Sequence, residues 1–255
     1  MSSYETIAVE LADSVALVRL DRPDRMNALS ATLVRELGSV VAEAERDDAV
    51  HVLVITGDER AFSAGADLKE TAPPLSEEEI NSVFNGLENL PKPTIAAIRG
   101  WCIAGGLELA LACDLRVAAT DAKIGDWHVK IDSIGGAGAT VRLARLVGLA
   151  RAKELVYTGA AVNGEAAYRI GLVNRVCSAD DVVETALVLG REIAEHNPVT
   201  LAHAKRALRL GADLDLCHAL EVSLQVQGEL VRALGGDFGA RFEARQEKRR
   251  SRARS

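Results

Sequence analysis

Apolar and polar positions along the chain follow two periods, and the order in which these periods alternate predicts the fold class. Apolar runs at 6–10 and 15–20, joined by Ala-Asp-Ser, predict an antiparallel hairpin. Apolar residues at helical spacing then predict a helix over 31–47, which Ser30 caps, and the run 50–56 predicts a buried strand. A strand, a helix and a second strand in this order indicate a crossover connection, so we expect an α/β fold.

The alternation continues through the middle of the chain and gives way to helices at its end. We expect a helix over 78–90, strands at 94–98, 115–118 and 173–177, an irregular or extended segment at 123–132, a helix that ends near 147, and further helices at 150–158, 163–170, 179–196, 198–210, 213–234 and from 237. We therefore expect residues 1–195 to form the core that carries the site, and residues 196–255 to form an appended helical region of the kind that often makes a subunit interface.

Gly105 and Gly106 join the strand 94–98 to an apolar helix. Because glycine has no Cβ, a ligand can approach the backbone there, and the N–H groups in the first turn of a helix lack partners within the helix. A second turn of small residues, 62–68, follows the strand 50–56, and ligands bind at strand ends in α/β domains. The two turns could face each other and supply the N–H donors of an oxyanion hole. The alternative is that the glycines only let a helix pack tightly against a strand.

Glu108 is the only charged residue between 107 and 113, three residues after Gly105 and on the same helical face. A carboxylate among apolar side chains is costly to bury unless it has a partner or a function. Alternatively, the helix dipole favours an acidic residue in the first turn, with its carboxylate in water.

Charge and the remaining residue types exclude several classes of protein. The formal net charge is −7, and residues 241–255 hold seven Arg or Lys and two Glu, so the rest of the chain carries −12. An acidic body argues against a nucleic-acid-binding domain, whereas the basic tail is either a solvated helix end or a contact for phosphates.

The cysteines form no CxxC pair, the histidines form no HExxH pair, and the chain has neither a P-loop nor a Gly-x-Ser-x-Gly elbow. With no export signal and no apolar run of membrane-spanning length, we expect a cytoplasmic protein that binds no metal ion, nucleic acid or membrane.

Several motifs occur in a recognisable order: Arg22-Pro23 with Asn27-Ala28-Leu29, then residues 61–70, 93–100, 104–110 and Cys113-Asp114, and last 134–140 with Leu143-Ala144-Arg145. In this order they resemble the crotonase superfamily, the enoyl-CoA hydratase/isomerase family, over about residues 5–250. The resemblance implies a crotonase-like spiral of ββα repeats with a C-terminal helical trimerisation region. It also implies a homotrimer or a dimer of trimers that acts on an acyl-CoA thioester, with coenzyme A as part of the substrate and no tightly bound cofactor.

The resemblance also implies roles for individual residues. The backbone N–H groups of Ala66 and Gly105 would hold the thioester oxygen as it becomes an enolate. The binding site for coenzyme A would be formed by Ala64, Gly65, Asp67 and Leu68 at its adenine and pantetheine end, with Asp24, Arg25 and Met26 nearby and Lys69 close to the nucleotide. Lys248 and Arg249 in the basic tail are further candidates for phosphate contacts, and for these two and Lys69 ordinary surface charge is the alternative.

Hydratases of this family carry two glutamates that position and activate the water. Glu108 matches the first, but the second falls on His128, Trp127 stands where a proline is common, and Gly136 stands where some isomerases and dehalogenases carry an aspartate. Histidine can act as a general acid or base near neutral pH, so His128 is a candidate partner of Glu108. Alternatively Asp132 orients His128, or His128 is a buried, hydrogen-bonded residue with no catalytic role.

These residues lead to one main hypothesis and two alternatives. The main hypothesis is an enoyl-CoA hydratase-like lyase that adds water across the 2,3 double bond through an oxyanion-stabilised thioester enolate. The alternatives are a hydrolase or C–C cleaving enzyme that acts on an unusual acyl-CoA, and a non-catalytic acyl-CoA-binding homologue.

Overall fold

The computed structural model describes residues 4–71 and 75–252, which form two compact units. The first unit runs to His196 and the second begins at Asn197. The first unit contains all the strands of the described residues and all the candidate site residues whose side chains are described.

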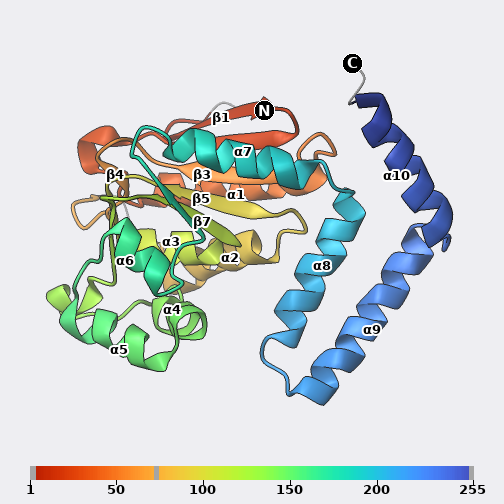
Figure 1. Cartoon of the computed structure of the whole chain (residues 1–255). Coiled ribbons are helices and arrows are strands. Elements are labelled where there is room, and N and C mark those ends of the chain that lie inside the picture. Colours follow the sequence, from red (N-terminus) through yellow and green to blue (C-terminus); the bar gives the residue numbers. More distant parts are fainter. Residues whose placement is uncertain (1–3, 72–74, 253–255) are drawn as a thin grey trace. The chain divides into compact units, whose positions relative to one another are not determined.

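A six-stranded sheet is the centre of the first unit (Figure 1). Its strands, in spatial order, are β1 (Ile7–Ala12), β2 (Val15–Leu20), β3 (Val52–Thr56), β5 (Thr94–Ile98), β7 (Leu115–Ala119) and β9 (Arg175–Cys177). The first pair is antiparallel, which confirms the predicted hairpin, and the other pairs are parallel. Since β3 and β5 are buried at every position, they have the continuous apolar character of strands that are covered on both faces.

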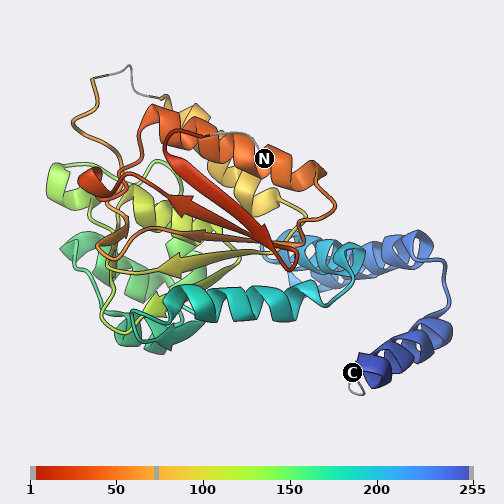
Figure 2. The same ribbon diagram turned by 90° about the horizontal axis from the view of Figure 1, so that it is seen from above.

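Helices cover both faces of this sheet. Figure 2 shows α1 (Ala31–Arg46) on one face and α7 (Val182–Ala194) on the other. Ser30 caps α1 as predicted, since its side chain accepts a hydrogen bond from the Leu33 N–H. On the opposite face, a Cβ added at Gly190 of α7 would lie 3.1 Å from Val15, so this helix packs directly on β2.

A smaller sheet of three parallel strands completes a repeated ββα pattern. Its strands are β4 (Ala61–Ser63), β6 (Trp101–Ile103) and β8 (Lys123–Gly125), and they precede α2 (Glu77–Asn89), α3 (Gly105–Ala112) and α4 (Ala139–Val147) respectively. In each repeat the first strand (β3, β5 or β7) joins the large sheet and the second joins the small sheet. The small strands were not predicted, because three residues are too few to show a period.

Short helices connect the repeats to the rest of the unit: the 3-10 helices Pro23–Arg25 (η1) and His128–Ile131 (η2), and the α-helices α5 (Leu149–Thr158) and α6 (Gly164–Arg169). The segment 123–132, expected to be irregular or extended, therefore holds both β8 and η2.

The second unit is helical, as predicted, with α8 (Pro198–Gly211), α9 (Leu216–Ala233) and α10 (Phe238–Arg252). Helices α8 and α9 run antiparallel beside each other (Figure 1). The side chains of Leu216, Leu220 and Leu224, which lie at four-residue spacing on α9, are exposed in the single chain.

Candidate active site

The parallel pairing of β4 with β6 brings two turns together. Ala61 lies opposite Trp101, so the turns that follow the two strands are neighbours. A Cβ added at Gly65 would lie 3.0 Å from the Gly105 nitrogen, and one added at Gly105 would lie 3.4 Å from the Ala66 nitrogen. The expectation that the two turns face each other is met.

The backbone N–H groups of Ala66 and Gly105 are available to a ligand. Within the described residues neither donates a hydrogen bond to another protein group, and Gly105 is the first residue of α3. Gly106 has a different task, since a Cβ there would lie 2.9 Å from the carbonyl carbon of Ser63. Tight packing therefore explains Gly106, whereas Gly105 faces the second turn.

The residue before Gly105 holds a strained conformation. Ala104 has φ 50° and ψ −123°, a region that residues with a Cβ rarely adopt. Non-glycine residues in such regions cost of order 1–3 kcal/mol each and are found mostly at functional sites. The strain lies where the chain turns from β6 into α3 and sets the direction of the Gly105 N–H.

Three backbone hydrogen bonds hold the Ala66 turn against the segment 22–29. The Leu29 N–H donates to the Gly65 carbonyl (2.8 Å), the Asp67 N–H donates to the Leu29 carbonyl (3.2 Å), and the Ala64 N–H donates to the Met26 carbonyl (3.0 Å). Two segments that are far apart in the sequence, both expected to bind coenzyme A, are thus brought together.

An ion pair reinforces this junction. Arg22 Nη2 lies 2.8 Å from Asp67 Oδ2, and Arg22 Nη1 also donates to the Ala28 carbonyl. Burial raises the pKa of Asp67, but the hydrogen bond and the charge of Arg22 outweigh it and hold that pKa below its usual value. Of the other expected coenzyme A residues, Asp24, Arg25, Leu68 and Lys69 are exposed and Met26 is half-buried. Lys248 and Arg249 belong to α10, and their side chains lie outside the described residues.

Glu108 is buried at the side of α3 that faces a third glycine-rich turn, residues 133–138, which precedes α4. It is 3% exposed, so the alternative that its carboxylate points into water is wrong. Its Oε1 accepts a hydrogen bond from the Ala139 N–H at 3.0 Å. Burial raises the pKa of Glu108 above its usual value despite this hydrogen bond and the nearby His128.

The structure brings His128 to Glu108. His128 Nε2 lies 3.7 Å from Glu108 Oε2, and His128 Nδ1 lies 2.5 Å from Asp126 Oδ1. The same Asp126 oxygen accepts the His128 backbone N–H at 3.1 Å, and Asp126 is 1% exposed. Burial lowers the pKa of His128, but the hydrogen bond and charge of Asp126, together with the charges of Glu108 and Glu77, raise it above its usual value.

Asp126, not Asp132, orients His128. Asp132 is exposed and ends η2 with a left-handed φ of 54°, and its backbone N–H donates to the Val129 carbonyl. The 3-10 turn thus places Asp132 beyond the histidine, whereas Asp126 precedes it by two residues and reaches both its backbone and its ring. The hypothesis that Asp132 orients His128 is wrong.

Gly135 closes this group of side chains from the third turn. A Cβ added there would lie 2.7 Å from Glu108 Oε1 and 3.2 Å from His128 Cε1. Only glycine leaves room for the carboxylate and the ring. Sequence reasoning missed the roles of Asp126, Gly135 and Ala139. An aspartate whose side chain accepts the N–H two residues on is a turn signal that could have identified Asp126.

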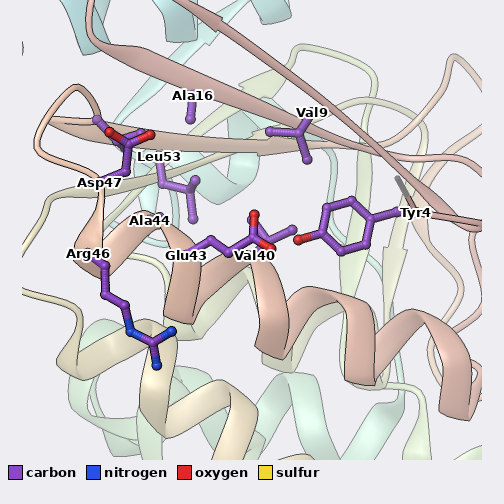
Figure 3. Close-up of a pocket in the computed structure, with 10 residues that line it drawn as sticks. Tyr4, Val9, Ala16, Val40, Glu43, Ala44, Arg46, Asp47 and Leu53 are labelled. Atoms are coloured by element: carbon purple, nitrogen blue, oxygen red, sulfur yellow. The ribbon is translucent and has the colours of Figure 1, made fainter. Parts of the chain in front are cut away.

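A cavity of about 290 Å³ lies elsewhere in the first unit, between α1 and the strands β1 to β3. Figure 3 shows the Tyr4 ring pointing towards Val40 and Glu43 of α1 at this cavity. No residue that lines it belongs to the candidate site, so the candidate site is defined by the contacts above and not by this cavity.

Within residues 4–71 and 75–252, no group of three His, Cys, Asp or Glu side chains is arranged to hold a metal ion. No helix in the same ranges combines the length and apolar character needed to cross a membrane.

Comparison with known proteins shows the family. Residues 10–247 match the family model for enoyl-CoA hydratase/isomerase. The chain is 36% identical over 230 residues to the short-chain-enoyl-CoA hydratase of Clostridium acetobutylicum, which covers 88% of each chain. It is 39% identical over 219 residues to the mitochondrial methylglutaconyl-CoA hydratase of Mus musculus, which covers 82% of this chain and 70% of that protein.

Solved structures give the same result at the level of the fold. The crystal structure of an enoyl-CoA hydratase from Bacillus anthracis superposes with a TM-score of 0.89 at 35% identity over 97% of each chain. The expected crotonase-like α/β spiral with a helical C-terminal region is therefore confirmed. The chain belongs to the enoyl-CoA hydratase/isomerase family.

Proposed function

We propose that this protein is an enoyl-CoA hydratase-like lyase, which adds water across the 2,3 double bond of an enoyl-CoA thioester. One observation carries the proposal: a buried carboxylate and an imidazole, Glu108 and His128, lie 3.7 Å apart in the family's fold. The N–H group of Gly105 lies at the turn from which the helix of Glu108 starts, and that of Ala66 lies in the turn that faces it. The names of the hydratases to which the chain is similar support the same reaction class.

The N–H groups of Ala66 and Gly105 would bind the thioester oxygen. As water attacks the β-carbon, the electrons of the double bond move towards the carbonyl and give an enolate. Both donors then face the developing negative charge, and the positive end of the α3 dipole adds to the stabilisation. Removing one such donor typically costs about 10²–10³ in rate.

Glu108 and His128 would divide the proton transfers. The Glu108 carboxylate takes a proton from the water as its oxygen bonds to the β-carbon, and the His128 imidazolium gives a proton to the α-carbon. The enolate electrons form the new C–H bond, so the product carries the hydroxyl on the β-carbon and the proton from His128 on the α-carbon, while the proton taken from the water is on Glu108. The proton on Glu108 can then return to His128 across the short distance between Oε2 and Nε2, which restores the starting state.

The ionisation of the pair fits these roles. A raised pKa makes Glu108 a stronger base, and a raised pKa favours the protonated form of His128 over that of an ordinary histidine. We expect a bell-shaped profile of kcat/KM against pH, because activity is lost when Glu108 is protonated at low pH and when His128 is deprotonated at high pH.

Coenzyme A would lie along the junction of the two surface segments. Ala64, Gly65, Asp67 and Leu68 would line its pantetheine and adenine end, and Asp24, Arg25, Met26 and Lys69 would lie near the nucleotide. The hydrogen bonds between these segments and the Arg22–Asp67 ion pair support this placement. The reaction would need no tightly bound cofactor, since the proposed proton carriers and oxyanion donors all belong to the chain.

Hydration of crotonyl-CoA and longer enoyl-CoAs tests the proposal. Wild type should consume the enoyl thioester, and Glu108→Gln should lower kcat by roughly 10²–10⁴ because the general base is lost. Circular dichroism checks that the variant is folded. A folded wild type with no turnover, or an unimpaired Glu108→Gln, would contradict the assignment.

Hydrolysis of an acyl-CoA is the second candidate, and the Asp126–His128 contact favours it. A histidine held at Nδ1 by a buried carboxylate is the arrangement of a general base that activates water. Release of free coenzyme A thiol from a panel of acyl-CoAs would identify a hydrolase. A non-catalytic binding homologue is less favoured, since it gives no reason to retain a buried carboxylate with a raised pKa.

The helical C-terminal unit supports self-association. The exposed leucines 216, 220 and 224 of α9 form an apolar stripe suited to cover by a second copy of the chain. We propose a homotrimer or a dimer of trimers, which light scattering can determine. The thiols of Cys102 and Cys113 are buried and belong to no disulfide, which supports a reducing compartment such as the cytoplasm.

A further inference from the structure

A fourth ionisable side chain reaches the catalytic group from outside the segments considered so far. Glu77 is the first residue of α2, and a Cβ added at Gly136 would overlap its Oε2 and lie 2.7 Å from its Cδ. Gly136 follows Gly135, the residue that lies against both Glu108 and His128. The carboxylate of Glu77 therefore occupies the space beside the catalytic pair that a side chain at position 136 would fill.

The polar face of α2 fixes this position. Glu77, Asn81, Asn85 and Glu88 follow one another at spacings of four, four and three residues, so they share one side of the helix. Asn81 Nδ2 donates to the Gly136 carbonyl at 2.9 Å. This bond ties the N-terminal part of α2 directly to the glycine-rich turn.

Arg142 of α4 extends the same junction. Its guanidinium donates to the Asn85 side chain and to Glu88 Oε2, each at 2.7 Å, and to the Ala137 carbonyl, also at 2.7 Å. Side chains of α2 thus contact the turn at Gly136 and, through Arg142, at Ala137. Glu77 lies at the end of this polar face, next to the catalytic pair.

The charged groups around His128 come from several elements. Asp126 contacts the ring, and Glu108 and Glu77 face it from α3 and α2; all three favour the imidazolium. On its own segment, Lys130 stacks on the Trp127 ring and Asp132 is exposed. Helix α5 packs against η2 and carries exposed Lys153, Arg151 and Glu154, of which the last two pair at 2.7 Å. Glu77 is thus the residue of α2 whose negative charge acts on His128.

We propose that Glu77 is a positioning residue of the active site, held over Gly136 by the polar face of α2, and that it favours the protonated imidazole of His128. In consequence His128, the proposed general acid, stays protonated at higher pH than it would with Asp126 and Glu108 alone. The catalytic meaning of this inference rests on the proposed function, which gives His128 the role of general acid.

Titration of His128 in the resting protein tests the placement without any reaction. NMR of isotope-labelled histidine, assigned with His128→Gln, follows its ionisation in wild type and in Glu77→Gln. The variant should lower the His128 midpoint by roughly 0.3–0.7 pH unit, the size expected for an exposed charge such as Glu77, and high salt should shrink the difference. Glu78→Gln is the matched control, because it removes the same charge from the same helical turn and Glu78 is not among the groups that act on His128. Equal midpoints in the two variants would overturn the proposal.

Hydration kinetics supply the second readout. In Glu77→Gln the alkaline limb of kcat/KM should move to lower pH by the same amount, which is about a 2–5-fold loss above that limb. Asn81→Ala, which removes the bond to Gly136 but no charge, should lower kcat without moving the limb. Hydration with an unmoved limb in Glu77→Gln overturns the inference alone. A shifted His128 titration in a protein that hydrates no enoyl-CoA overturns the proposed function alone.

Discussion

The proposed catalytic pair, Glu108 and His128, lies between two walls that are built in opposite ways. The α3 wall, residues 104–112, is a helix in which all eight helical residues are buried and Glu108 is the only charge. The 126–139 segment has only a short 3-10 helix, exposes many of its residues, and contributes Asp126, His128 and Gly135. The α3 wall holds the proposed base, Glu108, and one proposed oxyanion donor, the Gly105 N–H. The 126–139 segment supplies the proposed acid, His128, that faces them.

This difference indicates where the reaction can vary. A change in α3 disturbs a buried helix whose neighbours cannot easily rearrange, so the proposed oxyanion donor and the proposed base are tied to the fold itself. The 126–139 segment is a connection, and its side chains can change with less effect on the core. Here the segment supplies a histidine with an aspartate behind it, at the place where a hydratase of this family would carry a second glutamate.

Gly135→Ala should produce the largest loss of activity, because the added methyl group of the 126–139 segment would clash with Glu108 of the α3 wall. The new Cβ would lie 2.7 Å from Glu108 Oε1 and 2.6 Å from Ala139 Cβ, so the carboxylate must move. Displacement of a catalytic group by about 1 Å costs roughly 10²-fold, and we expect at least that loss in kcat. Steady-state kinetics on crotonyl-CoA measure it.

Gly86→Ala is the control for that substitution. A Cβ there would meet nothing closer than Val41 at 3.9 Å, and the position lies within α2. Activity should persist, and stability should rise by up to about 1 kcal/mol from helix propensity. An active Gly135→Ala would show that the third turn does not constrain the pair.

The sequence predicted the α3 wall well, because an apolar run follows a glycine turn at the end of a buried strand. The buried strand 94–98 before it, the glycines at the turn and the isolated charge of Glu108 are all visible in the order of residues. The partner turn at Ala66 was also expected at a strand end. Its hydrogen bonds to Met26 and Leu29 join residues more than 35 positions apart, and no local pattern reports them.

The 126–139 segment was predicted in part. His128 was identified by its position relative to the family's second glutamate, but the alternative in which Asp132 orients it was wrong. In an irregular segment, side-chain direction depends on the turns that the chain adopts. Here η2 turns Asp132 away and leaves Asp126 at both the ring and the backbone of His128. The contact of Gly135 with Glu108 depends on the packing of two repeats, which no spacing reveals.

Asp126→Asn should cause the next largest loss of activity. It separates two contributions of Asp126 to His128, the orientation of the ring and the negative charge beside it. An amide can keep the shape but not the negative charge, so the His128 pKa falls and the alkaline limb of kcat/KM should move down by about 1–2 pH units. We expect kcat at neutral pH to fall by about 10–100-fold as the imidazolium is lost. Asp132→Asn, the same change within the same segment, should leave the limb in place. Equal limbs in the two variants would restore Asp132 as a candidate.

The same contact links stability to pH. The folded pKa of His128 is raised above its unfolded value of about 6.5, so the contribution to folding is fully present below that value and is lost as pH rises through the folded pKa. Unfolding measurements should show wild type losing stability relative to Asp126→Asn across this interval, and parallel curves would contradict a charged pair.

Ala104→Gly should have the smallest effect and examines the α3 wall. Glycine adopts the φ of 50° without a clash, so the strain of order 1–3 kcal/mol is relieved, while the freer unfolded chain offsets about 0.4–1 kcal/mol of that gain. We expect stability to stay equal or rise by about 1 kcal/mol in denaturant unfolding. Activity should fall less than 10-fold, since the freer turn holds the Gly105 N–H less firmly. Ala112→Gly, at the other end of α3 in ordinary helical conformation, should instead lose about 1 kcal/mol. If both variants lose the same stability, Ala104 carries no strain, and the rigidity of the α3 wall comes from its burial alone.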